Sequence, residues 1–145
     1  MRIEFFAKGL FGLTLGVCAM LTPPALADAV SYKAEIRGSQ EVPPVPGDGK
    51  GSADVTYDAA TKKLTWKVTF SGLTGPATAA HFHGPAEPGK NAGVAVPITG
   101  AASPLEGSAT LTDAQAADLT GGKWYVNIHT AANKGGEIRG QVVKK

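Results

Sequence analysis

Apolar and polar side chains alternate with a period of two residues along several stretches of the chain. The clearest stretch covers residues 64–70 and consists of Leu-Thr-Trp-Lys-Val-Thr-Phe. Because successive side chains of a β-strand point to opposite faces of a sheet, this alternation predicts a strand with one buried face. The same pattern occurs at 32–37, 53–57 and 124–129, and we expect further strands at 78–83, 93–98, 106–111 and 136–143.

Turn-forming residues separate these stretches, and a single segment has the features of a helix. Glycine and proline gather at 43–49, 72–76, 85–89 and 134–136. Within 112–120, Thr112 and Gln115 have the spacing of a capping box and two glycines follow, which predicts one short helical turn. About eight short strands with these turns predict an all-β fold, an antiparallel Greek-key sandwich of two sheets.

The first 27 residues have the three parts of a secretory signal peptide in the usual order. Arg2 and Lys8 precede an apolar run at 10–21, and the small residues Ala25 and Ala27 flank Leu26. About 20 apolar residues are needed to span a bilayer, so we expect membrane contact only through this leader. Cleavage after Ala27 would leave residues 28–145 as a single periplasmic or secreted domain. We do not expect lipidation at Cys18, because Val17 replaces the usual small residue before it.

Charge and cysteine content narrow the possible chemistry. The 145 residues include 14 Lys and Arg against 12 Asp and Glu, a net charge of +2 without a basic tract. This balance argues against a nucleic-acid-binding protein, which usually carries a basic stripe. The one cysteine and both methionines lie in the predicted leader, so a soft-metal site in the mature chain must use imidazole.

The chain has three histidines, and their positions favour a metal site. His81 and His83 share one face of a predicted strand, while Phe82 occupies the other face. His129 likewise lies opposite the apolar Ile128. If the two strands pair, three ring nitrogens converge and leave one coordination position open. Affinity for divalent ions peaks at copper, so we predict one copper ion, with zinc as the alternative.

Three polar residues lie near these histidines in the sequence pattern. Arg139 and Glu137 share a strand face, and Asn127 lies two residues before His129 on the same face. They could position an imidazole ring, as metal-bound histidines usually require, or form an ordinary cross-strand ion pair. We expect the ion pair for Glu137, whereas Arg139 could instead attract a small anion.

Four motifs in order along the chain resemble the CHRD domain, the module named after chordin. They are Gln40-Glu41-Val42-Pro43-Pro44, Ala79-Ala80-His81-Phe82-His83-Gly84-Pro85-Ala86, Tyr125-Val126-Asn127-Ile128-His129-Thr130 and Gly136-Glu137-Ile138-Arg139-Gly140-Gln141. The resemblance covers about residues 31–143 and implies a β-sandwich, in bacteria usually an exported single-domain protein. Lys134-Gly135 departs from the Pro-Gly often found in the family, which affects only a turn.

The histidine pattern also resembles the copper site of copper/zinc superoxide dismutases, which are Greek-key sandwiches too. This resemblance implies that His81, His83 and His129 bind copper and that Arg139 guides a small anion such as superoxide. Those enzymes have a fourth, bridging histidine and a zinc subsite, whereas this chain has three histidines in all. A copper-only site is therefore what the resemblance predicts.

Four functions remain open from the sequence. The first is an exported copper-binding protein, and the second is a copper-only enzyme that acts on superoxide. The third is a zinc hydrolase or hydratase, since three imidazoles can lower the pKa of zinc-bound water to about 7. The fourth is a metal-free protein-interaction module that uses exposed sheet faces and the proline-rich loop 42–47.

Overall fold

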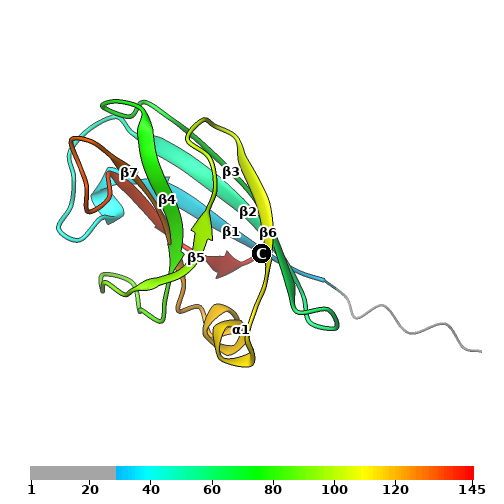
Figure 1. Ribbon diagram of the computed structural model, residues 1–145. Helices are drawn as coiled ribbons and strands as arrows, with labels where there is room; N and C mark the ends of the chain where they lie inside the picture. Colours follow the sequence, from blue (N-terminus) through cyan, green and yellow to red (C-terminus); the bar gives the residue numbers. More distant parts are fainter. Residues whose placement is uncertain (1–28) are drawn as a thin grey trace, which may run out of the picture.

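The computed structural model describes residues 29–145, so the predicted signal peptide lies outside the described residues. This part of the chain forms nine strands, one α-helix and one 3-10 turn (Figure 1). The elements are β1 (Val30–Arg37), η1 (Gly38–Gln40), β2 (Lys50–Asp58), β3 (Lys63–Ser71), β4 (Ala77–His83), β5 (Val94–Ile98), β6 (Leu105–Thr110), α1 (Asp113–Thr120), β7 (Tyr125–Thr130), β8 (Ile138–Gln141) and β9 (Val143–Lys144). Within residues 29–145, no helix has the length and apolar character needed to cross a membrane.

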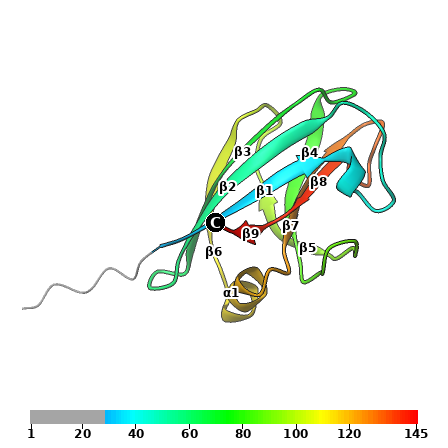
Figure 2. The same ribbon diagram turned by 180° about the vertical axis from the view of Figure 1, so that it is seen from behind.

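All strand pairs are antiparallel, and the strands form one sheet in the order β5-β4-β7-β8-β1-β2-β3-β6, with β9 beside β1. The sheet curls so that β4, β5 and β7 lie in front of β1, β2 and β3, and Figure 2 shows the same arrangement from behind. Its edge strands β5 and β6 approach each other, which makes the sheet nearly barrel-shaped.

The antiparallel all-β prediction is therefore confirmed, but the division into two sheets is not. Hydrogen bonds continue from strand to strand through the whole order, because the twist of a large sheet lets it fold over its own core. After the β4–β5 hairpin the chain returns as β6 beside β3. Alternation along a strand identifies its buried face and carries no information on which edges join.

The core fills the inside of the curled sheet with the side chains that the alternation placed on the apolar face. Leu64, Val68, Phe82 and Trp124 are fully buried there. Trp66 of β3 meets Phe82 of β4 edge to face, with 5.4 Å between ring centroids. This contact joins the two sides of the sheet across its interior.

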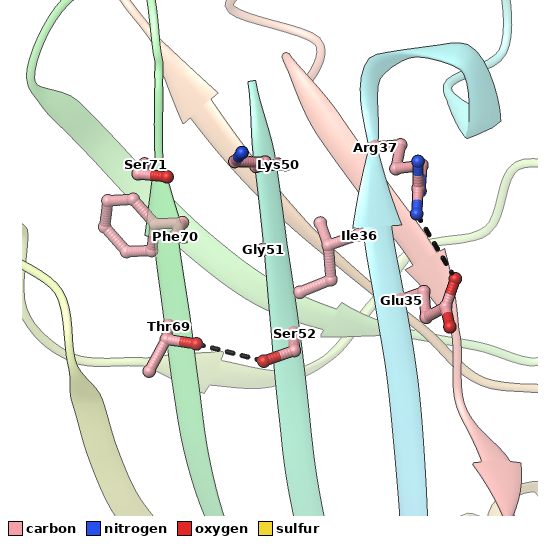
Figure 3. A pocket seen from close by; sticks show the side chains of 9 residues that line it. All are labelled: Glu35, Ile36, Arg37, Lys50, Gly51, Ser52, Thr69, Phe70 and Ser71. Carbon is pink, nitrogen blue, oxygen red and sulfur yellow. Dashed lines mark hydrogen bonds and ion pairs between the residues drawn. The ribbon is translucent and has the colours of Figure 1, made fainter. Parts of the chain in front are cut away.

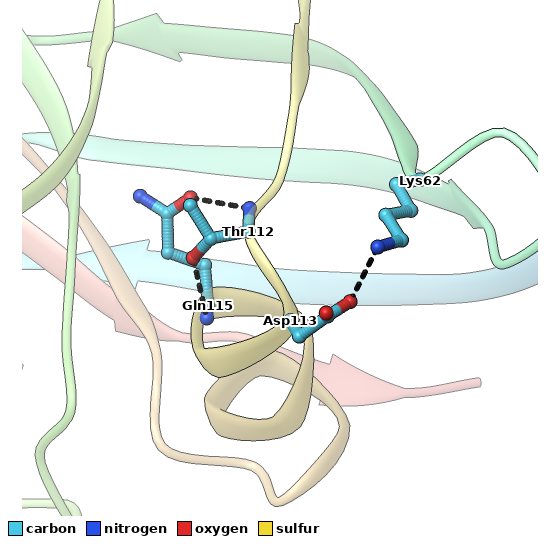
Figure 4. Close-up of polar contacts among 4 residues, drawn as sticks. All are labelled: Lys62, Thr112, Asp113 and Gln115. Carbon is cyan, nitrogen blue, oxygen red and sulfur yellow. Dashed lines mark hydrogen bonds and ion pairs between the residues drawn. The ribbon is translucent and has the colours of Figure 1, made fainter.

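Helix α1 begins at the predicted cap. The Thr112 hydroxyl accepts from the Gln115 amide at 3.2 Å, and the Gln115 side chain accepts from the Thr112 amide at 2.9 Å (Figure 4). Gln115 Nε2 also donates to the Ala95 carbonyl of β5, which ties the helix to the sheet edge. Outside the cap, Lys62 forms an exposed ion pair with Asp113 at 2.6 Å.

A shallow hollow lies at one end of β1, β2 and β3, where Gly51 pairs with Phe70 and Ile36 on either side (Figure 3). The Ser52 and Thr69 hydroxyls lie 3.0 Å apart in its wall. None of the described residues that line this hollow is a histidine. It is therefore separate from the histidine cluster.

The predicted strand at 136–143 divides into β8 and β9. Val142 lies between β8 and β9, fully buried, and its amide donates to the Trp124 carbonyl.

Both faces of β7 are buried, because the loop at 84–93 packs over its outer face. This covered outer face holds the three histidines.

Candidate metal centre

Antiparallel pairing of β4 with β7 brings the three histidines together. His81 lies directly opposite Asn127, His83 opposite Tyr125, and Ala79 opposite His129. As the shared face of the two strands predicted, the three side chains cluster on the side of the sheet away from the core. One ring nitrogen from each histidine lies within 4.8 Å of the others.

Backbone carbonyls orient two of the rings. The Nδ1 of His83 lies 3.0 Å from the Ala92 carbonyl oxygen, and the Nδ1 of His129 lies 2.9 Å from that of Lys134. Each Nδ1–H donates to its carbonyl, which leaves a lone pair on Nε2, the atom that binds a metal. The Nδ1 of His81 lies 3.1 Å from the Nε2 of His129. The cluster can thus offer Nδ1 of His81 and Nε2 of the other two rings.

Burial sets the charge and the accessibility of the cluster. His83 is buried, while His81 and His129 are half-buried, so one side of the cluster is open. Burial lowers the pKa of His81, as do the neighbouring His129 and His83. Burial also lowers the pKa of His83, although its hydrogen bond to Ala92 opposes the effect. These two rings are neutral at neutral pH, the form in which imidazole binds metals.

Arg139 is part of a stack that ends at His83. Its guanidinium lies 3.4 Å from the Tyr125 ring centroid, and the Tyr125 ring stacks on His83 with 4.9 Å between centroids. Arg139 is 2% exposed and donates to Asn91 Oδ1 at 2.9 Å and to the Lys90 carbonyl at 2.5 Å. Because β7 lies between β4 and β8, the tyrosine separates the guanidinium from the histidines. The cation faces the 84–93 loop, whereas an anion guide would face the open side of the cluster.

Glu137 does not form the ion pair that the sequence led us to expect. Within residues 29–145 its carboxylate pairs with no cation and accepts hydrogen bonds from Thr74, Thr130 and Asn133. Burial would raise the pKa of Glu137, but these hydrogen bonds outweigh burial and lower it. The carboxylate fixes the turn at 131–136, whose Lys134 carbonyl orients His129.

Tyr125 and Glu41 also belong to this region, although the sequence pattern did not identify them as site residues. Tyr125 precedes Asn127 and His129 on the face expected to be solvated, and a large aromatic ring there was the available signal. Glu41 is 6% exposed, and its Oε1 has no hydrogen-bond partner among the described residues. Burial raises the pKa of Glu41 to about 7, although Arg139 and Asn127 oppose the effect. Its place before Val42-Pro43-Pro44 had indicated only a family motif.

A family model for the CHRD domain matches residues 32–142, from the third residue of β1 to the residue after β8. The chain belongs to the CHRD domain family. The matched part of this CHRD domain contains all three histidines. The chain matches none of the curated proteins and none of the solved structures with which it was compared.

The donor set of this CHRD domain suits a borderline metal ion. Three imidazole nitrogens converge, and the described residues place no carboxylate, thiol or thioether in the cluster. Nitrogen donors of this kind favour copper, zinc and nickel over magnesium and calcium, which prefer oxygen. The cluster could therefore hold one such ion, with its half-buried side open to a small molecule.

Proposed function

We propose that this CHRD-domain protein binds one copper ion through His81, His83 and His129. The observation that carries the proposal is the Nε2 of His83, which is buried and has no hydrogen-bond partner within residues 29–145. An unsatisfied buried polar atom costs about 1–3 kcal/mol, and a metal ion would give this nitrogen its missing partner. Zinc is the alternative metal, and the order of divalent-ion affinity favours copper.

The proposal includes export of the protein. Residues 1–27 support it through their basic start, apolar run and small-residue cleavage site. We expect the protein recovered from the periplasm or the medium to begin at Asp28 by mass spectrometry. Recovery of the chain in the cytoplasm with Met1 and the leader intact would contradict export.

Metal analysis and Cu(II) electron paramagnetic resonance test the copper site. We expect one copper per purified chain with nitrogen hyperfine structure, weakened binding in His83→Ala, and no specific copper in the variant that lacks all three histidines. Lys134→Ala is the matched control, because its side chain is exposed and only its backbone carbonyl contacts His129.

Each alternative outcome has a distinct meaning. Stoichiometric copper in the triple variant would refute the histidine site. Zinc that excludes copper from the wild-type protein would assign a zinc site instead. If the wild-type protein binds neither metal, the histidines are structural and a protein-interaction module becomes the better proposal.

Superoxide dismutation is the second candidate function, favoured by the half-buried state of His81 and His129. A copper ion held by the three histidines would supply redox chemistry between Cu(II) and Cu(I), by which one superoxide is oxidised to O₂ and a second is reduced, with two protons, to hydrogen peroxide. Arg139 would act by holding the 84–93 loop through Asn91 and Lys90. A rate no higher than that of equimolar copper–peptide controls would refute this function.

A further inference from the structure

Asn127 lies at the centre of the face that carries the histidines. It is directly opposite His81 across the β4–β7 pair, where opposing Cβ atoms are about 4.5–5.5 Å apart. His83 is one diagonal position away on β4, and His129 is two residues along β7 on the same face. Asn127 is 3% exposed, so it lies on the buried side of the cluster with His83, while His81 and His129 are half-buried.

The surroundings of the Asn127 side chain fix the direction of its amide. Nδ2 lies 3.4 Å from the Gly135 carbonyl, and a Cβ built on Gly136 would lie 2.6 Å from Nδ2. The same Cβ would contact Glu41 Oε1, so the amide nitrogen and this carboxyl oxygen border one small space. The Gly135 carbonyl and the Glu41 carboxyl group are both hydrogen-bond acceptors, so the NH₂ group of Asn127 faces them. The Oδ1 atom then points away from Glu41.

Two buried acceptor atoms on this face, one from Asn127 and one from His83, have no hydrogen-bond donor. Asn127 Oδ1 and His83 Nε2 are both buried and have no hydrogen-bond partner in the described part of the chain. The His83 proton is on Nδ1, where the Ala92 carbonyl accepts it, so Nε2 is an acceptor as well. A cation between the two acceptors would satisfy both.

We propose that the carboxamide oxygen of Asn127 is a fourth donor to the metal ion held by the three histidines. The inference rests on the proposed function and adds a ligand on the buried side, opposite the open side. A carboxamide oxygen is a harder donor than imidazole, so it stabilises Cu(II) and Zn(II) relative to Cu(I). It would therefore lower the reduction potential of the copper site, because ligand identity tunes that potential.

The test compares Asn127→Leu and Asn127→Asp with the wild-type protein by electron paramagnetic resonance, by reduction potential and by competition with a copper chelator. We expect Asn127→Leu to keep one copper, to lose about tenfold in Cu(II) affinity and to have a higher potential. Asn127→Asp should shift both quantities in the opposite direction. Gln40→Leu is the control, because that carboxamide is exposed, donates to the Glu35 carbonyl and lies outside the histidine cluster.

A wild-type spectrum and potential in Asn127→Leu would overturn the fourth donor and leave the three-histidine site intact. Absence of metal from the wild-type protein would instead refute the proposed function itself. If Asn127→Leu does not fold, the wild-type chain still gives an answer through the side-chain ¹³Cγ signals of its three asparagines during zinc titration. The Asn127 signal should shift most, with Asn91 and Asn133 as internal references, and an unchanged signal would refute the proposal.

Discussion

At the residue scale, the local supply of hydrogen-bond donors decides the state of two buried carboxyl groups. Glu137 accepts from Thr74, Thr130 and Asn133, and these bonds lower its pKa against the effect of burial. Glu41 is also buried, yet its Oε1 has no partner within residues 29–145, and burial raises its pKa to about 7. The pKa values of these two buried glutamates are thus shifted in opposite directions.

Glu41→Gln should change how stability depends on pH in the metal-free protein. The folded-state pKa of Glu41 is raised above its ordinary value, so the folded chain binds this proton more tightly than the unfolded chain does. The wild-type protein therefore loses free energy of unfolding as pH rises from about 4.5 to about 7. The glutamine variant lacks this loss, and at pH 8 it should be more stable by on the order of 1–3 kcal/mol.

Urea unfolding of both proteins between pH 4.5 and pH 8 measures this difference. The lowered pKa values of His81 and His83 are common to both proteins, so their contributions cancel in the comparison. Glu87→Gln is the control, because it also removes one carboxylate but at an exposed position. A difference between Glu41→Gln and the wild-type protein that stays constant across this pH range would contradict the expectation.

At the scale of elements, two strands and two loops build the site. The β4–β7 pair supplies all three histidines, and the loop at 84–93 supplies the Ala92 carbonyl that orients His83. Arg139 fastens this loop from β8, while Glu137 fastens the turn that orients His129. Helix α1 contributes no residue to the cluster, which separates its role from that of the site.

Thr112→Ala should therefore lower stability without affecting metal binding. The substitution removes the hydroxyl that accepts from the Gln115 amide, and loss of such a cap costs about 1 kcal/mol. Urea unfolding measures this loss, and metal analysis of the folded variant should match the wild-type protein. Lys62→Ala is the control and should have no measurable effect, because its ion pair with Asp113 is exposed. Loss of metal in Thr112→Ala would contradict the separation of helix and site.

At the scale of the whole molecule, the core and the histidine cluster lie on opposite faces of the same strands. Phe82, Val126 and Ile128 are fully buried on the inner face, while His81 and Asn127 lie on the outer face. The apolar interior is complete without a metal ion. Folding is thus expected to come before metal binding, in contrast to small zinc domains that unfold without metal.

Removal of metal should leave the protein folded and lower its melting temperature. Free metal at 100 times Kd adds about 2.7 kcal/mol to stability by mass action, which raises Tm by on the order of 10 °C in a domain of this size. Far-ultraviolet circular dichroism during heating, with and without chelator, measures both effects. An equal rise of Tm in the variant that lacks all three histidines would show that the metal acts elsewhere, and unfolding by chelator alone would contradict an independent core.

Local pattern was enough to locate most strands and their buried faces. The alternation at 64–70 and at 124–129 predicted the inward side chains of β3 and β7, and the Thr112–Gln115 spacing predicted the helix start. The four motifs identified the CHRD family, and the shared face of His81 and His83 followed from their spacing. These features depend on residues a few positions apart, which is why the sequence alone determines them.

Tertiary packing decided everything that depends on distant residues. His81 and His129 are 48 positions apart, and only the register of β4 against β7 brings their nitrogens within 3.1 Å. Packing of the 84–93 loop turned an expected solvated face into a buried one, enclosed Arg139, and gave Asn127 its central position. The single curled sheet, in place of the expected two sheets, has the same cause. Edge pairing and loop contacts are set by the free energy of the whole fold, and they leave no periodic pattern in the sequence.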